Sequence, residues 1–484
     1  MINGSALPRL PKADVERLHD ASLEVLADKG IAIYDDTLRG LLLNAGAIPS
    51  TDQLLCLPRS LVEWALSQAP RDIRLYDMAG NSMRLEAGSR FLTTPGDSLH
   101  FYDSATETLR DPQLADVGPY VRLADALPEI AMTRGQPMTL VQPEGILGIL
   151  LVTEQLLLNT TKHHFISPIG VDMVDVWIDM ASIVSRGEAI GKRPFFSAMI
   201  CPVSPLRIGI EGEQKLLALA NHKIPIAATC APIMGATAPY TQAGTLALLN
   251  AENLAVLVSA QVVQPGTPVF LAPAPCLMDM VTAAICMATP EFFQMHLGAM
   301  SLAEYYGLPS YHQLAHTDSP SLDYQAGLER GLSMLAWWLA GPAMIGSAGQ
   351  FHKATVASPE QLLMDAEWYR HVRTLCSSFA VNDEELALDE IAETEPGGNF
   401  LIGRRTLEHL RDGSVFSTQV FNRDSLQGTP RPAIERARER VADIVNSHSP
   451  KVPADIADEI RGYMGERLRS AGKRDGLEPH QFSR

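Results

Sequence analysis

The chain has 484 residues, of which 46% are hydrophobic, so it can bury a core larger than one average domain requires. Its formal net charge is -17, which disfavours nucleic acid and anionic membranes as partners, because both attract basic surfaces. The acidity alone indicates only a well-solvated surface.

Residues 1–88 predict a helical N-terminal region. Apolar stripes indicate two helices within residues 13–46, and a third helix is expected over Arg59–Gln68.

The hydrophobic pattern changes over residues 89–356, where short apolar strands alternate with helical patterns. The expected strands are Phe91–Thr94, Ile130–Thr133, His164–Pro168, Phe195–Cys201, Ile224–Thr229, Pro268–Ala272, Ser310–Leu314 and Ala343–Ser347. The expected helices begin at Asp111-Pro112 or cover Ile146–Leu158, Glu211–Ala220, Thr241–Val262, Pro290–Tyr306 and Leu322–Ala340. Eight alternating units predict a closed (β/α)₈ TIM barrel as the catalytic domain. No G-x-G-x-x-G follows a strand, which argues against a doubly wound sheet.

Residues 357–484 predict a C-terminal helical region. Helices are expected over Pro359–Phe379, Pro430–Ser447 and Asp455–Leu468, and residues 471–484 have the composition of a solvated tail.

The cysteines and the N-terminus bear on the compartment. Six cysteines are widely spaced without a CxxC pair, which is typical of reduced thiols in a cytoplasmic protein. Residues 1–20 lack the apolar run of a signal peptide. The uncharged stretches 253–278 and 331–351 are interrupted by proline and glycine, so each predicts a buried helix followed by a buried strand. We expect a cytoplasmic protein with no membrane partner.

A barrel enzyme forms its site at the carboxyl ends of the strands, and that rule selects the candidate substrate-binding residues. They follow strand one, strand seven and strand eight, and comprise Asp97, His100, Tyr102, His312, His316, Asp318, Gln350, Phe351 and His352. Because residues four apart on a strand share a face, His312 and His316 are expected to point inward together. The adjacent His163 and His164 must face opposite ways, and a structural role is favoured for both.

No metal site is expected, because zinc requires three or four ligands and the spacing does not supply them. One alternative nevertheless stays open: a metal-dependent barrel hydrolase or lyase that uses His312, His316 and Asp318. A second alternative is a non-catalytic barrel that binds betaines.

Longer segments are more specific than any of these single residues. Residues 21–33, 102–130, 201–207, 231–269, 317–349 and 357–367 resemble, in the same order, blocks of the trimethylamine methyltransferase family. The resemblance covers nearly the whole chain. It implies a (β/α)₈ barrel that moves a methyl group from an amine to the Co(I) corrinoid of a separate small protein.

The resemblance also has departures that bear on cofactor and substrate. The chain lacks a D-x-H-x-x-G corrinoid-binding motif, so the corrinoid is expected on the partner, with no cofactor held tightly by this chain. Archaeal relatives carry pyrrolysine on strand seven, whereas the matching region His312–Ser319 has only standard residues. The chain therefore resembles the non-pyrrolysine branch, which is similar to glycine betaine methyltransferases.

The chemistry of the leaving group favours a quaternary amine as substrate, because such an amine departs as a neutral tertiary amine. No nucleophilic side chain is then required, only orientation of the methyl group. Aromatic faces or carboxylates would hold the ammonium, with Tyr102, Phe351, Asp97 and Asp318 as candidates. Histidines would hold a substrate carboxylate. We also expect a homo-oligomer.

Overall fold

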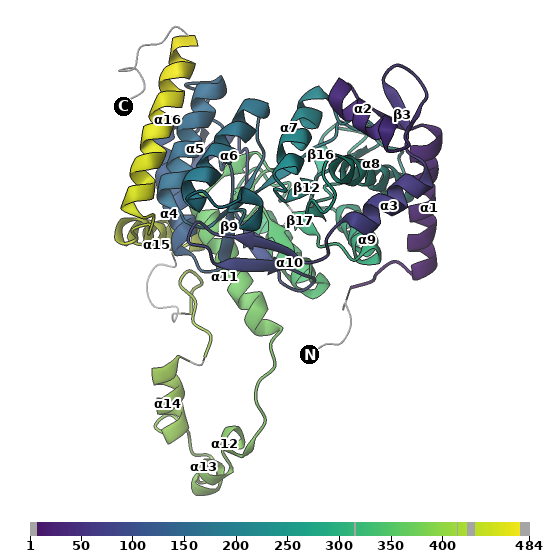
Figure 1. The fold of residues 1–484 in the computed structure, drawn as a ribbon. Coiled ribbons are helices and arrows are strands. Elements are labelled where there is room, and N and C mark those ends of the chain that lie inside the picture. Colours follow the sequence, from purple (N-terminus) through teal and green to yellow (C-terminus); the bar gives the residue numbers. More distant parts are fainter. Residues whose placement is uncertain (1–6, 314–315, 414, 424–430, 475–484) are drawn as a thin grey trace.

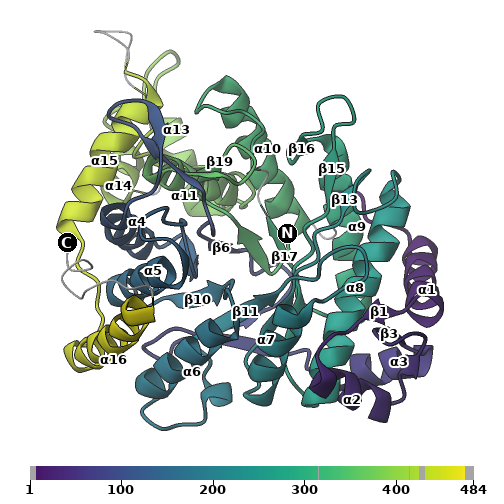
Figure 2. The ribbon, with the colours of Figure 1, turned by 90° about the horizontal axis from the view of Figure 1, so that it is seen from above.

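A computed structural model describes residues 7–313, 316–413, 415–423 and 431–474, with a ring of eight parallel strands at its centre (Figures 1 and 2). The strands are β6 (Phe91–Thr93), β9 (Ile130–Arg134), β10 (His163–Ile166), β11 (Phe196–Ile200), β12 (Ile226–Ala228), β14 (Val269–Leu271), β17 (Tyr311–Gln313) and β18 (Met344–Gly346). Each lies in or overlaps an expected strand. A parallel bridge between Leu271 and Ser310 closes the ring, so the predicted TIM barrel is confirmed.

Helices follow all eight strands and cover the barrel from outside (Figure 2). They are α4 (Leu114–Ala126), α5 (Gly145–Asn159), α6 (Val171–Ser185), α7 (Ile210–Asn221), α8 (Gln242–Val263), α9 (Pro290–Tyr306), α10 (Tyr324–Ala340) and α11 (Pro359–Leu375). The sequence did not predict α6, whose valines and aspartates have low helix propensity and whose helicity comes from packing its Trp177 face. The expected start of α4 at Asp111-Pro112 is wrong: the helix begins at Leu114 with Gln113 as its N-cap, and the Asp116 carboxylate accepts from Gln113 N–H.

The 22-residue α8 is long and apolar enough to cross a membrane by length and composition. Most of it is nevertheless buried inside the protein, between the barrel and the N-terminal helices α1 (Lys12–Asp28) and α3 (Arg59–Gln68). It leads into β14, which confirms the expected buried helix followed by a buried strand.

The N-terminal region is less purely helical than predicted. Besides α1, α3 and α2 (Asp36–Asn44), it holds a small sheet of β1 (Ile31–Ala32), β2 (Ile48–Pro49) and β3 (Leu54–Cys56). These strands have two or three residues each, too few for a period-two signal in the sequence.

A hairpin closes the amino end of the barrel. Its strands, β4 (Ile73–Tyr76) and β5 (Ser82–Leu85), place Ile73, Leu75 and Leu85 against the inward side chains of the barrel. That cluster also includes Phe165 and Tyr311, both fully buried. The barrel interior is therefore a packed core at this end.

The C-terminal region packs partly on the barrel and partly away from it. Helices α15 (Ala433–Ser447) and α16 (Ala454–Arg474) contact α4, α5, α6 and α11. Residues 376–413, hereafter the arm, project from the body and contain α12 (Asp383–Leu386), α13 (Leu388–Glu393) and α14 (Arg404–Asp412) (Figure 1). Helix α11 ends at Leu375, four residues before the predicted Phe379. Of the expected tail 471–484, residues 471–474 instead belong to α16 and Ala471 is buried, whereas residues 475–484 lie outside the described part.

Candidate functional site

Polar side chains meet inside the barrel at the carboxyl ends of adjacent strands. Alternation along β9 turns Met132 into the core and Arg134, two residues later, toward the same interior one layer higher. The Ser167 hydroxyl, just beyond β10, lies 3.4 Å from Nη2 of Arg134. Cys201, just beyond β11, is within electrostatic range of the same guanidinium. The layer formed by Arg134, Ser167 and Cys201 faces the opening at the carboxyl end of the barrel.

Arg134 lies over an apolar floor. Its guanidinium carbon is 5.9 Å from the centre of the Phe165 ring, and Nη2 is 3.4 Å from the Met199 sulfur. A Cβ on Gly96 would lie 2.7 Å from Nε of Arg134, so the glycine makes room for the guanidinium. In the sequence, Arg134 is a lone arginine at the end of an apolar strand, in the segment Met132-Thr133-Arg134-Gly135. It was not among the substrate-binding residues that were predicted from the sequence.

Asp97 is the carboxylate opposite this arginine. Its Oδ2 is 3.4 Å from Nη2 of Arg134, and its backbone is left-handed with φ of 60°. Burial raises the pKa of the Asp97 carboxyl, and the positive charge of Arg134 partly counters that effect. Yet 40% of the Asp97 side chain is exposed, against 9% for Arg134. The carboxylate is thus crowded by protein on one side and open to solvent on the other.

Gln350 supports the loop that carries Asp97. Its Nε2 donates to the Ser98 hydroxyl at 2.9 Å and to the Gly96 carbonyl at 3.3 Å. It also donates to the Ala354 carbonyl, within a turn where His352, Lys353 and Ala354 all have positive φ. The structure therefore brings Gln350 to the site as a positioning residue, while the His352 ring bonds locally to the Thr355 hydroxyl.

A buried ion pair holds the same loop from behind. Arg330 on α10 and Asp365 on α11 are both fully buried, with Nε and Oδ1 3.1 Å apart. The Asp365 carboxylate also accepts the Gly349 N–H at 2.7 Å, and Arg330 donates to the Ser347 carbonyl. Two helices and the strand-eight loop are thereby locked together.

His316 lies beyond the end of β17 and close to the charged layer. It is buried, its Nε2 contacts the Gln313 amide oxygen at 3.0 Å, and its Nδ1 has no partner among the described residues. Burial, with the charges of Arg330 and Arg134, holds its pKa well below the ordinary value, so the imidazole is neutral. Asp318, half-buried, accepts the Met287 N–H at 3.1 Å on the neighbouring strand-six loop.

His312 points away from the barrel interior, contrary to expectation. Its ring stacks on Trp337 of α10, and its Nδ1 lies 3.0 Å from Nδ1 of His296 on α9. The inward residue of β17 is the neighbouring Tyr311. Because the strand ends at Gln313, the four-residue spacing does not carry His312 and His316 onto one strand face.

Three other candidates lie in a four-stranded sheet beside the barrel. There β7 (His100–Asp103) pairs with β8 (Thr108–Arg110) and β20 (Val356–Ala357), and β20 pairs with β19 (Gln350–Phe351). Tyr102 packs edge-to-face on Phe351, which is fully buried, and His100 is exposed. Among the contacts of the described residues, none joins any of the three to Arg134.

The adjacent histidines face opposite ways, as predicted. His163 points inward at the amino end and bonds to the Ser197 hydroxyl and the Tyr76 carbonyl, at 2.9 and 2.8 Å. His164 points outward to Trp177. Burial lowers the pKa of His163 to about 4 and that of His164 to about 3. Both belong to the packed structure of the barrel wall.

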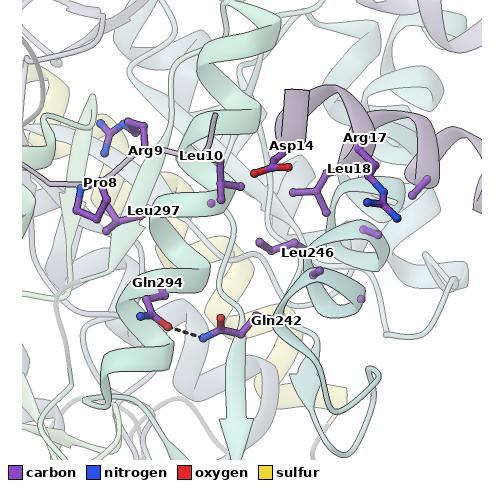
Figure 3. A pocket seen from close by; sticks show the side chains of 15 residues that line it. Pro8, Arg9, Leu10, Asp14, Arg17, Leu18, Gln242, Leu246, Gln294 and Leu297 are labelled. Atoms are coloured by element: carbon purple, nitrogen blue, oxygen red, sulfur yellow. Dashed lines mark hydrogen bonds between the residues drawn. The ribbon is translucent and has the colours of Figure 1, made fainter. Parts of the chain in front are cut away.

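Among the described residues, no three His, Cys, Asp or Glu side chains gather so that they could hold a metal ion. A cavity of about 770 Å³ lies outside the barrel, between the N-terminal segment, α1, α8 and α9 (Figure 3). The Gln242 amide bonds Gln294 across it, and Asp14 and Arg17 stand on its α1 side. Its walls are mainly apolar, and none of the strand-end residues line it.

The chain is similar to known methyltransferases along its full length. The family model for trimethylamine methyltransferase (MTTB) matches residues 4–472. The trimethylamine methyltransferase of Desulfitobacterium hafniense is 28% identical, over 96% of this chain and 95% of that protein. A glycine betaine methyltransferase of the same species is 24% identical, over 97% and 100%. The solved monomethylamine methyltransferase of Methanosarcina barkeri shares the fold, with a TM-score of 0.52, 12% identity and coverage of 98% and 90%. The chain belongs to the trimethylamine methyltransferase family.

Proposed function

We propose that this protein transfers a methyl group from a quaternary amine such as glycine betaine to the Co(I) corrinoid of a separate corrinoid protein. Family membership supports a methyltransferase, and the name of one relative supports a betaine substrate. Two features of the chain support binding of the amine and docking of the partner protein: a charged pair inside the barrel opening and an apolar surface around it.

The apolar surface around the barrel opening is the observation that supports docking of a partner protein. Loops after the strands' carboxyl ends expose large hydrophobic side chains, hereafter the apolar rim: Leu99, Val141, Ile169, Val203, Tyr240, Met280 and Val281. They come from six different strand-to-helix connections. Tyr240 and Met280 both approach Gly235, so at least these two loops meet.

The opposite end of the barrel provides the comparison. The helix-to-strand connections 127–129, 160–162, 186–195, 222–225, 264–268, 307–310 and 341–343 are all described, and none exposes a large hydrophobic side chain. Exposed apolar patches on soluble proteins typically mark contacts with other macromolecules. A partner that must reach the barrel interior with a corrinoid fits this one-sided distribution.

The reaction is a displacement at carbon. The methyl carbon is attacked by the nucleophilic cobalt of the acceptor, the C–N bond breaks, and its electron pair stays on nitrogen. The positive charge of the ammonium is lost, and the amine leaves neutral with no proton exchanged. The chain must therefore bind the amine, aim one methyl group at the opening and exclude competing geometries. Asp97 and Arg134 are the charged groups available for that binding.

We further propose a cytoplasmic location, because all six cysteines are free thiols, as is typical of proteins in a reducing compartment.

The function is tested by mixing the purified protein with a Co(I) corrinoid protein and a panel of methylated amines. The corrinoid absorbance should change with glycine betaine or another quaternary amine and not with trimethylamine. Turnover of trimethylamine without any quaternary amine would contradict the proposal. Activity that a chelator abolishes and one added metal restores would favour the hydrolase or lyase alternative.

A further inference from the structure

We propose that Arg134 and Asp97 form a two-point site for a zwitterion, in which the guanidinium binds a substrate carboxylate and the aspartate binds the quaternary ammonium. The substrate class is then the N-methylated amino-acid betaines, rather than quaternary amines in general. This inference rests on the proposed function for its catalytic consequence, but the binding site itself stands on the geometry of the two residues.

The guanidinium of Arg134 has no close anionic partner among the described residues. Asp97, Ser167 and Met199 each lie 3.4 Å from Nη2, and the Tyr311 side chain is a further neighbour within interaction range. Charge-assisted pairs normally lie about 2.7–2.9 Å apart. A nearly buried arginine with long contacts has capacity for a better acceptor, and a carboxylate matches the planar fork of its N–H groups.

Other arginines in the same chain form tight pairs. Arg110 holds both oxygens of Asp116 at 2.7 Å, and Arg330 pairs with Asp365 in a fully buried contact. Arg134 therefore differs from the arginines whose role is structural, because its one carboxylate neighbour stands off and is partly exposed.

The different depths of Arg134 and Asp97 set the direction in which a zwitterion would lie. Arg134 is nine-tenths buried on an apolar floor, and Asp97 reaches solvent above it. A carboxylate bound to the guanidinium would lie deep, and the ammonium would lie toward Asp97 and the opening. The N-methyl groups then face the apolar rim, which is where an acceptor on a partner protein can approach them.

Hydrogen bonds of the surrounding loop hold Asp97 in place. Its N–H donates to the Gln136 carbonyl at 2.5 Å, and Gln350 bonds both flanking residues, Gly96 and Ser98. These contacts keep a non-glycine residue in the left-handed region, a conformation that costs free energy and that surrounding contacts must stabilise. The carboxylate is thereby fixed before the ligand arrives, which lowers the entropy lost on binding.

The test compares three quaternary amines with wild type and with the Arg134→Met and Asp97→Asn variants. Glycine betaine carries a carboxylate, choline carries a hydroxyl, and tetramethylammonium carries neither. With wild type, kcat/KM for betaine should exceed that for choline at least tenfold. Arg134→Met should remove that preference by lowering betaine alone, whereas Asp97→Asn should lower all three. Arg207→Met, which removes an exposed arginine on the neighbouring strand-four loop, is the matched control.

Calorimetric titration of the protein alone with glycine betaine gives a readout independent of the corrinoid. Loss of binding in Arg134→Met with the melting temperature unchanged supports the site. An equal effect of Arg134→Met on all three amines, or unaltered betaine binding, overturns it. Should betaine bind through Arg134 while no quaternary amine methylates the corrinoid, the proposed function fails and the zwitterion site stands.

A second, independent observation concerns the arm. We infer that the arm packs against α10 of a second copy of this chain. None of the described residues of α12, α13 and α14 is buried. Phe379 is 87% exposed and Leu410 78%, and Leu388, Leu401 and Ile402 are also exposed. A segment with this many solvent-facing apolar side chains has no core of its own.

The same chain offers a matching surface. Tyr324, Leu328 and Leu332 lie four residues apart on α10, which aligns them on one helix face, and all three are exposed. Figure 1 shows the arm extending away from the body, so it does not cover this stripe within one chain. A second copy supplies both surfaces at once, as a self-complementary interface requires.

Light scattering after gel filtration tests the pairing. The wild-type particle should have at least twice the mass of one chain, which is 52.6 kDa. Leu410→Lys and Leu328→Lys should each reduce the mass toward that of one chain. Ile48→Lys, at an exposed apolar residue of β2, should leave the mass unchanged. A monomeric wild type, or an assembly that survives either substitution, overturns the inference.

Discussion

The imidazole of His312 stacks on the indole of Trp337, with ring centroids 5.2 Å apart and planes inclined by 29°. The same imidazole lies 3.0 Å from His296 and 3.2 Å from the Ser310 hydroxyl. His312 thus joins the outer face of β17 to α9 and α10.

His312→Ala should therefore destabilise the protein without impairing the reaction. The loss of a fully buried ring and its contacts should lower the free energy of unfolding by about 2–4 kcal/mol. Turnover per folded molecule should stay within about twofold of wild type, since no reacting group is touched. Urea unfolding beside the corrinoid assay measures both quantities. A tenfold fall in kcat with unchanged stability would contradict the scaffold role.

Buried histidines should make the protein sensitive to mild acid. Burial holds the pKa of His164 at about 3, whereas the unfolded chain takes up that proton near pH 6.5. Stability should consequently fall as the pH drops from about 6.5 toward 3, by about 1.4 kcal/mol per pH unit for this group. His164→Phe should reduce the slope by that amount, as measured by unfolding curves at several pH values. An unaltered slope would contradict the assignment.

Gly96→Ala tests the position of the Arg134 guanidinium. The new methyl group would lie 2.7 Å from Nε and 2.8 Å from Cζ, so the side chain must move. We expect kcat/KM for glycine betaine to fall at least about tenfold, the loss of roughly one charge-assisted hydrogen bond. Gly327→Ala on α10 is the control, because nothing lies within 4 Å of its added methyl group. Equal kinetics in the two variants would argue against the site.

Breaking the buried pair behind the strand-eight loop should be costly. Arg330→Met leaves Asp365 uncompensated in the interior, and we expect a loss of about 3–5 kcal/mol. Replacing both residues, as Arg330→Met with Asp365→Leu, should cost less than the sum of the single changes. Denaturant unfolding of the four proteins of this cycle gives the coupling. Additive effects would mean that the two charges do not depend on one another.

A charge on the apolar rim should weaken the partner and spare the amine. Val281 is 94% exposed on the strand-six loop, and Val281→Asp should raise the KM for the corrinoid protein at least about tenfold by placing a charge in an apolar contact. The calorimetric affinity for glycine betaine should not change. Tyr305→Asp, at an exposed aromatic residue near the amino end of the barrel, serves as the control. Loss of partner affinity in both variants would point to a different docking face.

The architecture could be predicted because it follows from repeated periodic signals. All eight strands and most of their helices lie where apolar runs indicated, and α9 covers the predicted range Pro290–Tyr306, although the cap expected at Asp111 does not start α4. The site was harder because it depends on strand phase. A shift of one residue exchanges Tyr311 for His312 on the inner face, and the sequence does not fix that phase in a strand buried on both sides.

Two other features left little trace in the sequence. Arg134 became prominent only when the barrel placed it opposite Asp97, 37 residues earlier in the chain. The arm carries apolar residues that its own short helices do not bury, and no helix was predicted between Phe379 and Pro430. In both cases the missing information is three-dimensional: a neighbour across the barrel, or a surface that this chain does not turn toward itself.

The hairpin of β4 and β5 has a kinetic consequence. Because Ile73, Leu75 and Leu85 fill the amino end, the approach to Arg134 through the described residues is from the carboxyl end of the barrel. Under the proposed function, a corrinoid protein seated on the apolar rim would cover that approach, and the amine would have to bind first. We therefore expect a compulsory order of addition, in which an excess of the corrinoid protein over the amine slows the cycle instead of driving it.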